Sequence, residues 1–213
     1  MAQLQVAIIP VTAFQQNCTL VWDADTKQAA VFDPGGDIDL VTERIREFGL
    51  DVKAIYLTHG HIDHAGGAME LKEKLDVPII GPHKDDEFLL AGLEEQAKMF
   101  GVEESVRNVT PDQWLKDGDT IKVGESTFQV VHCPGHSPGS VVYYNADNNY
   151  AQVGDVLFAG SIGRTDLPRG NHADLISSIK DKLLPLGDNI TFISGHGPDS
   201  TFGRERESNP FLK

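Results

Sequence analysis

Short apolar runs separated by polar turns fill the first half of the chain and predict β-strands. Between them, apolar residues recur at helical spacing, as Leu40, Val41 and Ile45 do. We expect the apolar side chains of the last helix in this half, Phe100 among them, to pack into the core. The expected strands are 6–9, 18–22, 29–32, 52–57 and 78–80, and the expected helices are 40–48 with Asp37 as N-cap, 65–75 and 85–100.

From Trp114 onward the pattern changes to strands with tight turns, followed by one helix. The order is therefore strands and then helices, twice over, with more strands in each half than a Rossmann pattern uses. Two mixed β-sheets packed face to face with helices outside, an α/β fold of αββα type, satisfy this order. No linker interrupts it, so residues 1–213 are expected to form one domain. The expected elements are strands 120–123, 127–132, 141–145, 150–153, 156–159 and 190–193, and a helix over 175–184.

Charge and composition narrow the choice of partners. The 213 residues carry a net charge of −14. Because a negatively charged surface repels phosphate backbones, a nucleic-acid partner is not expected. The N-terminus lacks a basic region followed by a long apolar one, and no apolar run approaches the roughly 20 residues of a bilayer span. Two cysteines, Cys18 and Cys133, are too few for a disulfide framework. The expected location is the cytoplasm, away from membranes.

The segment Thr58–His64 (THGHIDH) carries the chemistry, because His59, His61, Asp63 and His64 are all good metal ligands. It follows the predicted strand 52–57. His59 and His61 are separated by one residue, so in an extended loop they point the same way and can hold one ion. Asp63 and His64 follow where the chain turns toward the next helix and can reach a second ion. Two ions about 3.5–4 Å apart can share a water and stabilise both ends of a displacement.

Two metal sites need more ligands than this segment supplies, and three further residues follow predicted strands in loops rich in Gly or Pro. They are His136 in a Pro/Gly-framed loop, Asp155 after Gly154, and His196 between Gly195 and Gly197. Each alone is more often a turn residue, but together they complete a set. The predicted assignment is His59, His61 and His136 on one metal, Asp63, His64 and His196 on the other, and Asp155 as a bridge.

Several residues have a plainer alternative. A closed structural zinc site would favour paired cysteines, which the chain lacks. Asp33 can support the metal site from behind or can simply form the turn before Pro34 and Gly35. Cys133 is interpreted as a small buried residue. The remaining histidines, His83, His132 and His172, are interpreted as structural rather than as ligands.

These residues make the chain resemble the metallo-β-lactamase-fold hydrolases. The matching segments are Thr58–His64, Gly135–Gly139, Gly154–Asp155 and Gly195–Gly197, and the resemblance covers essentially the whole chain. It implies the αββα sandwich and the same metal assignment. The best-known β-lactamases carry Cys at the ligand position that Asp155 occupies here, so β-lactam hydrolysis is not expected as the main function. The expected metals are two divalent ions, zinc first, with iron or manganese as alternatives.

Within the superfamily, the chain resembles the short bacterial type of glyoxalase II, or hydroxyacylglutathione hydrolase. The stretch 160–170 and the ending 195–198 through 209–211 support this. Larger members carry a C-terminal helical domain that helps to hold glutathione, and this chain ends about where that domain would begin. Weaker glutathione binding or a different thioester is the implied consequence. Arg164 resembles a position that binds glutathione in relatives, and Arg169, Arg204 and Arg206 are the other candidate guanidinium groups.

The resemblance implies hydrolysis of a thioester such as S-lactoylglutathione by a metal-bound hydroxide. Asp63 is expected to bind a metal and to orient that hydroxide. A rival enzyme on the same fold is a persulfide dioxygenase, in which His59, His136 and Asp155 would hold a single iron. A non-catalytic binding protein would be expected to have lost ligands, and all seven are present. The sequence assigns neither the acyl group nor the oligomeric state.

Overall fold

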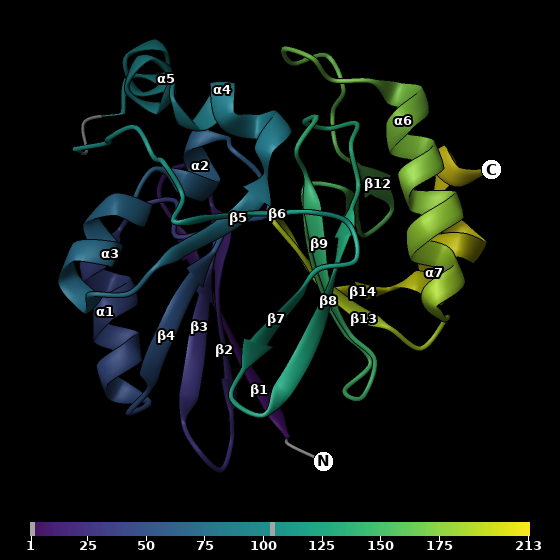
Figure 1. Cartoon of the computed structure of the whole chain (residues 1–213). Coiled ribbons are helices and arrows are strands. Elements are labelled where there is room, and N and C mark those ends of the chain that lie inside the picture. Colours follow the sequence, from purple (N-terminus) through teal and green to yellow (C-terminus); the bar gives the residue numbers. More distant parts are fainter. Residues whose placement is uncertain (1–2, 103–104) are drawn as a thin grey trace.

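The structure is a computed structural model that describes residues 3–102 and 105–213. Two six-stranded sheets face each other, and helices cover their outer sides (Figure 1). The predicted αββα arrangement of two mixed sheets is confirmed. None of the helices in the described ranges has the length and apolar character that a bilayer span requires.

The first sheet contains the strands of the N-terminal half. Its first three strands run antiparallel and the rest pair in parallel, with β3 beside β4 and β4 beside β5. This arrangement places the C-terminal ends of β3, β4 and β5 at one edge, from which the ligand-bearing loop emerges. In order across the sheet the strands are β1 (Leu4–Val11), β2 (Gln16–Asp23), β3 (Gln28–Phe32), β4 (Asp51–Tyr56), β5 (Ile79–His83) and β6 (Gln113–Leu115).

The second sheet contains the strands of the C-terminal half. Only β10 and β13 pair in parallel, and the other neighbours are antiparallel. A small hairpin of β11 (Leu157–Phe158) and β12 (Ser161–Ile162) follows β10. Across the sheet the strands are β14 (Ser200–Thr201), β13 (Thr191–Ser194), β10 (Tyr150–Gly154), β9 (Val141–Asn145), β8 (Ser126–His132) and β7 (Thr120–Val123).

Helices pack on both outer faces. On the first sheet lie α1 (Ile38–Glu47), α2 (Ile62–Ala65), α3 (Ala68–Leu75), α4 (Glu87–Leu90) and α5 (Leu93–Phe100), and on the second lie α6 (His172–Ser177) and α7 (Phe202–Ser208) (Figure 1). A π-helical segment, Ser178–Leu183, continues α6. Asn171 caps α6, because its Oδ1 accepts from the N–H groups of Ala173 and Asp174 at 2.9 and 3.2 Å.

The core consists of three apolar layers. One lies between the first sheet and α1 and α3, and another lies between the second sheet and α6 and α7. The middle layer fills the space between the sheets and is aromatic, with Phe32, Phe128 and Tyr143 fully buried. The Phe32 and Tyr143 rings meet edge to face at 5.2 Å. This layer holds the two sheets together, and therefore the loops that leave them, in a fixed relation.

Three helix predictions were wrong in detail. The single helix expected over 65–75 begins earlier, at Ile62, and divides into α2 and α3 at Gly66 and Gly67. The stretch 85–100 divides into a 3₁₀ turn, α4 and α5, with the break at Ala91 and Gly92. Asp37 precedes α1, but its φ is +50° and its side chain accepts from the Thr12 N–H instead of capping. Tertiary contacts thus override local helix signals.

The C-terminal tail contains a helix that was not predicted. The segment after Thr201 forms α7, and the Thr201 Oγ1 accepts from the Arg204 N–H at 3.2 Å. The short edge strands β6 and β14 were not predicted either. Strands of two or three residues give almost no alternating pattern, so only their pairing reveals them.

Candidate metal centre

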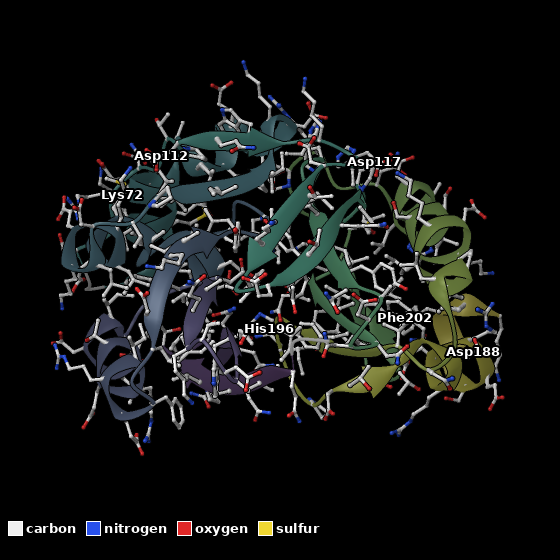
Figure 2. The ribbon with its side chains drawn as sticks, turned by 60° about the horizontal axis from the view of Figure 1, so that its bottom comes forward. Lys72, Asp112, Asp117, Asp188, His196 and Phe202 are labelled. Carbon is white, nitrogen blue, oxygen red and sulfur yellow. The ribbon has the colours of Figure 1, made fainter. Side chains whose placement is uncertain are left out.

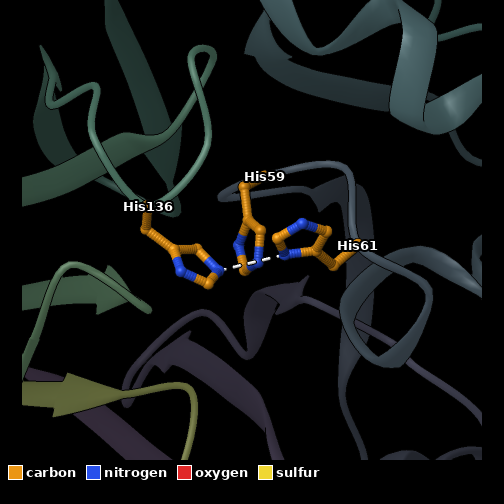
Figure 3. Close-up of side chains that lie close together, drawn as sticks. All are labelled: His59, His61 and His136. Carbon is orange, nitrogen blue, oxygen red and sulfur yellow. Dashed lines mark hydrogen bonds between the residues drawn. The ribbon is translucent and has the colours of Figure 1, made fainter. Parts of the chain in front are cut away.

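Three imidazoles converge from two loops to form the first ligand group. His59 follows β4, His61 stands at the start of α2, and His136 lies in the loop after β8. Figure 3 shows the three rings facing one another, with His61 Nδ1 3.0 Å from His136 Nε2. The His59 and His136 side chains are buried, while His61 is partly open to solvent. One ligand atom from each lies within 4.8 Å of the others, which is the reach of a single ion.

The second ligand group contains Asp63, His64 and His196. One ligand atom from each of them also lies within 4.8 Å of the others. Asp63 and His64 belong to α2, not to a loop as the sequence suggested. His196 follows β13 and comes from the other half of the chain. Its Nε2 lies 3.1 Å from Asp63 Oδ2. In Figure 2, His196 lies between the two halves of the ribbon, far from surface residues such as Asp188.

Asp155 lies between the two groups. Its Oδ1 is 3.3 Å from His64 Nε2, and its Oδ2 is 3.6 Å from His136 Nε2 and 3.7 Å from His196 Nε2. A Cβ at Gly195 would stand 2.1 Å from Asp155 Oδ1, so only glycine allows this close approach. One carboxylate therefore faces both groups, as a bridging ligand must.

Hydrogen bonds behind the rings leave the inward nitrogens free. His64 Nδ1 lies 2.9 Å from Asp33 Oδ2, and His136 Nδ1 lies 2.8 Å from the Arg164 carbonyl oxygen, so each Nδ1–H donates outward. Thr58 donates its hydroxyl to Asp33 and accepts from His59 Nδ1 at 3.0 Å. These partners assign the Nε2 lone pairs of all three imidazoles to the centre. Asp33, for which a turn role was equally open, makes these hydrogen bonds behind the rings, and its φ is +51°.

Three buried polar atoms in this centre have no hydrogen-bond partner: His59 Nε2, His64 Nε2 and Asp155 Oδ1. A buried polar atom without a partner costs on the order of 1–3 kcal/mol. All three point into the space between the ligand groups, where a cation would satisfy them. The donor set of imidazole and carboxylate suits zinc, iron and manganese. The residues therefore fit a pair of metal ions.

The pKa values of the histidines differ between the two ligand groups. Burial, together with the neighbouring histidines, holds the pKa of His59 well below its usual value, and burial and His136 lower the pKa of His61 to about 3. Burial also opposes protonation of His64, but Asp155, Asp63 and Asp33 outweigh it and raise its pKa well above the usual value. A metal ligand must be neutral imidazole, so metal binding at the second group releases a proton.

The pocket beside the centre has a volume of about 510 Å³ and one apolar wall. Phe14 and Phe100 form its outer part, with rings edge to face at 6.0 Å. The prediction that Phe100 packs into the core was wrong, because its side chain is 55% exposed at this rim. Leu89, Leu93 and Ala97 from the same stretch are buried as expected. Helix α5 thus contributes its buried face to the core and its end to the pocket.

Of the four candidate guanidinium groups, Arg164 is the one that lines this pocket. Its Nε and one terminal nitrogen donate to the two oxygens of Asp166, each at 2.7 Å. Arg169 stacks on Phe88 at 4.0 Å beside a different cavity, and Arg206 pairs with Asp188 at 2.8 Å on α7. An anionic substrate would have to compete with Asp166 for Arg164.

A separate cluster of metal-ligand residue types lies away from the centre and contains His83, Asp85 and His132. The two rings stack at 4.1 Å with an interplanar angle of 20°. Lone pairs of stacked imidazoles run side by side and do not converge on one point, so this arrangement does not suit an ion. His132 Nε2 also donates to the Pro138 carbonyl at 2.8 Å. His172 begins α6 and is exposed.

Sequence reasoning missed residues that hold the ligands without being ligands. Gln96 on α5 accepts from the Ile62 N–H at 3.1 Å and thereby fixes the first turn of α2, which carries Asp63 and His64. Asp86 and Ser137 bond to each other beside the first group, with Ser137 Oγ 2.7 Å from Asp86 Oδ2. Gln96 and Asp86 lie outside the matching segments, and Ser137 lies inside one but is not a ligand type. The one available signal was the burial of polar residues, which a single sequence does not display.

The chain is similar to a known protein family and to curated members of it. The family model of the metallo-beta-lactamase superfamily matches residues 11–196. A Haemophilus influenzae protein named "Hydroxyacylglutathione hydrolase GloC" is 49% identical over 210 residues, with 98% of each chain covered.

Two solved structures match over nearly their whole length. The structure titled BLEG-1 B3 metallo-beta-lactamase has a TM-score of 0.89 and 37% identity, with 98% of this chain and 99% of that chain covered. The structure titled TTHA1623 in a di-iron-bound form has a TM-score of 0.87 and 35% identity, with 97% and 100% covered.

Proposed function

The chain belongs to the metallo-beta-lactamase superfamily, and we propose that it is a hydroxyacylglutathione hydrolase that cleaves S-lactoylglutathione-like thioesters with a water at a two-metal centre. The observation that carries the proposal is Asp155, whose two oxygens face two separate ligand groups, 3.3 Å from His64 and 3.6 Å from His136. The name of the Haemophilus relative supplies the substrate class. Zinc is the proposed metal, with iron as the alternative that the di-iron structure supports.

The proposed ligands are His59, His61 and His136 for one ion and Asp63, His64 and His196 for the other, with Asp155 bridging. Bound there, two divalent ions would lower the pKa of a shared water toward about 7 and polarise the thioester carbonyl. The chain itself keeps the rings in position through Asp33, Thr58 and the Arg164 carbonyl. This orientation holds the lone pairs of the ligands in place before substrate arrives.

Asp63 is the proposed catalytic residue. Its Oδ2 is 3.1 Å from His196 Nε2 and its side chain is partly open to the pocket, so its carboxylate can accept a hydrogen bond from the attacking water and orient it. The leaving group is a thiolate, whose free pKa near 8.5 makes departure possible without a strong general acid. This agrees with a pocket in which the described lining contains neither Lys nor Tyr.

The glutathione part of the substrate is proposed to bind at the rim of the pocket. Arg164 at the rim is the proposed partner of a glutathione carboxylate, because a guanidinium can grip both carboxylate oxygens. Together with the apolar wall of Phe14 and Phe100, this rim position is the proposed binding surface for the glutathione part of the substrate.

The test is hydrolysis of S-lactoylglutathione by purified protein, with metal content measured on the same sample. Turnover with close to two metals per chain is the expected result. A single iron per chain, no turnover and oxygen uptake with glutathione persulfide would replace the proposal with the dioxygenase. Because one similar structure bears a β-lactamase title, a β-lactam is assayed in parallel, and a higher kcat/KM for it than for the thioester would contradict the proposal.

A further inference from the structure

Asp86 is a buried carboxylate that bonds to both loops of the first ligand group. It ends the 3₁₀ turn Lys84–Asp86 and is fully buried. Its Oδ2 accepts from the Gly60 N–H at 2.9 Å and from the Ser137 hydroxyl at 2.7 Å. Its Oδ1 accepts from the Gly139 N–H at 2.6 Å. One side chain therefore receives three hydrogen bonds from two segments far apart in the sequence.

Those two segments carry all three residues of the first ligand group, and Asp63 and His64 of the second group follow the first segment on α2. Gly60 stands between His59 and His61, and Ser137 follows His136 directly. In contrast, the hydrogen bonds behind the second group come from elsewhere, such as Asp33 on His64 and Gln96 on the start of α2. Asp86 thus joins the two loops whose separation sets the 3.0 Å approach of His61 to His136.

The backbone of Gly139 lies close against Asp86. A Cβ at Gly139 would lie 2.6 Å from both Asp86 N and Cγ, so glycine allows the loop to approach near enough for its N–H to reach the carboxylate. Burial raises the pKa of Asp86 to about 6, against the three donors, so the fold keeps a carboxyl group where an apolar side chain would be cheaper to bury. An apolar side chain could not accept the three hydrogen bonds that join the two loops.

We propose that Asp86 is the positioning residue of the first metal position: it fixes the distance between the loop of His59 and His61 and the loop of His136, and so sets the affinity of that position alone. The proposal rests on the two-metal centre of the proposed function. Asp86 does not touch substrate in this role. Its effect passes through the backbone N–H of Gly60 and the hydroxyl of Ser137.

The test measures zinc affinity in the full chain by competition with a zinc indicator of known affinity. In Asp86→Asn the side chain keeps its size, but an amide N–H₂ faces the Gly60 N–H, which is a donor itself. We expect the affinity of one metal position to fall about 10- to 100-fold and that of the other to stay within a factor of two. His61→Ala and His196→Ala identify which position is which, and Asp86→Asn should resemble His61→Ala.

The matched control is Asp23→Asn. Asp23 also accepts backbone N–H groups from two segments, but far from the centre, so it should lower stability without changing either affinity. Ser137→Ala, which removes one of the three bonds, should weaken the same position by a smaller factor and serves if Asp86→Asn does not fold. Equal weakening of both positions, or none, would overturn the proposal, whereas a wild-type chain without two metals would overturn the proposed function instead.

Discussion

Asp63 stands where the second ligand group meets the pocket, and two roles are proposed for its carboxylate. It lies 3.1 Å from His196 Nε2 and 3.7 Å from His64 Nε2, and part of it faces solvent. The aspartates around it are placed differently: Asp33 accepts hydrogen bonds from Thr58 and His64, and Asp155 is enclosed by three imidazoles. Asp63 is therefore the carboxylate best placed to bind a metal and to orient a water.

Replacing Asp63 with Ala should lower kcat for S-lactoylglutathione by roughly 10²- to 10⁴-fold, the usual contribution of a positioned acid or base. The measurement is steady-state kinetics with metal content determined on the same preparation. Normal turnover with full metal content would refute the role of Asp63. The His61→Ala variant provides the comparison, since it should reduce metal content first and activity as a result.

Arg164 gives a second prediction at this scale, because Asp166 already occupies its guanidinium through two bonds of 2.7 Å. Arg164→Ala should raise KM for S-lactoylglutathione about 3- to 10-fold and leave kcat nearly unchanged. Asp166→Ala frees the guanidinium and should lower KM. Arg204→Ala on α7 is the control and should change neither constant. If Arg164→Ala and Arg204→Ala behave alike, Arg164 is a surface residue only.

Among the elements, the β2–β3 hairpin is attached by hydrogen bonds to a turn of the second sheet. Asp23 Oδ1 accepts from the N–H groups of Asp25 and Thr26, both at 3.0 Å, and its Oδ2 accepts from Glu125 in the β7–β8 turn at 3.4 Å. A turn of the first sheet is thereby attached to a turn of the second. The Thr26 hydrogen bond, with those from Glu125 and Asp25, lowers the pKa of Asp23.

A lowered carboxyl pKa means that the folded state favours the ionised form. The resulting stabilisation is present above the unfolded pKa of 3.8 and is lost as the pH falls through the folded pKa. Asp23→Asn should therefore reduce the free energy of unfolding by about 1 kcal/mol at pH 7. The difference from the wild type should narrow as the pH falls below 3.8 and close below the folded pKa, as urea titrations at several pH values would reveal. A difference independent of pH would show that the charge of Asp23 is irrelevant.

For the whole molecule, the centre concentrates five imidazoles and two carboxylates between the sheets, three of whose buried atoms have no hydrogen-bond partner. Ions bound there stabilise only the folded chain, by about 4 kcal/mol for each site at a thousandfold excess over Kd. In a chain of this size, 1 kcal/mol corresponds to a change in Tm of about 2–4 °C. Metal content should thus be a large part of its thermal stability.

Treatment with a strong chelator should lower Tm by about 10 °C or more, and added zinc should restore it. Differential scanning calorimetry measures both steps. The control is a variant with His59 and His64 both replaced by Ala, whose Tm should not respond to the chelator. A chelator shift of equal size in that variant would place the metal-dependent stability elsewhere in the chain.

The sequence by itself determined most of the two sheets and the seven candidate ligands. Strands such as 18–22 and 141–145 are local apolar runs, and the candidate ligands lie in short segments that follow strands, so the pattern is readable without any long-range contact. The two proposed groups could be assigned because only one residue separates His59 from His61. His136, Asp155 and His196 each follow a predicted strand in a loop rich in Gly or Pro.

Tertiary structure alone decided what supports those ligands. The break between α2 and α3, the exposure of Phe100 at the pocket rim and the pairing of Arg164 with Asp166 depend on what each element packs against. The same holds for Asp86, which stands in the acidic run 85–87 and would be read as a solvated surface residue. Its burial and its bonds to Gly60 and Gly139 exist only because two loops from opposite halves of the chain meet at one side chain.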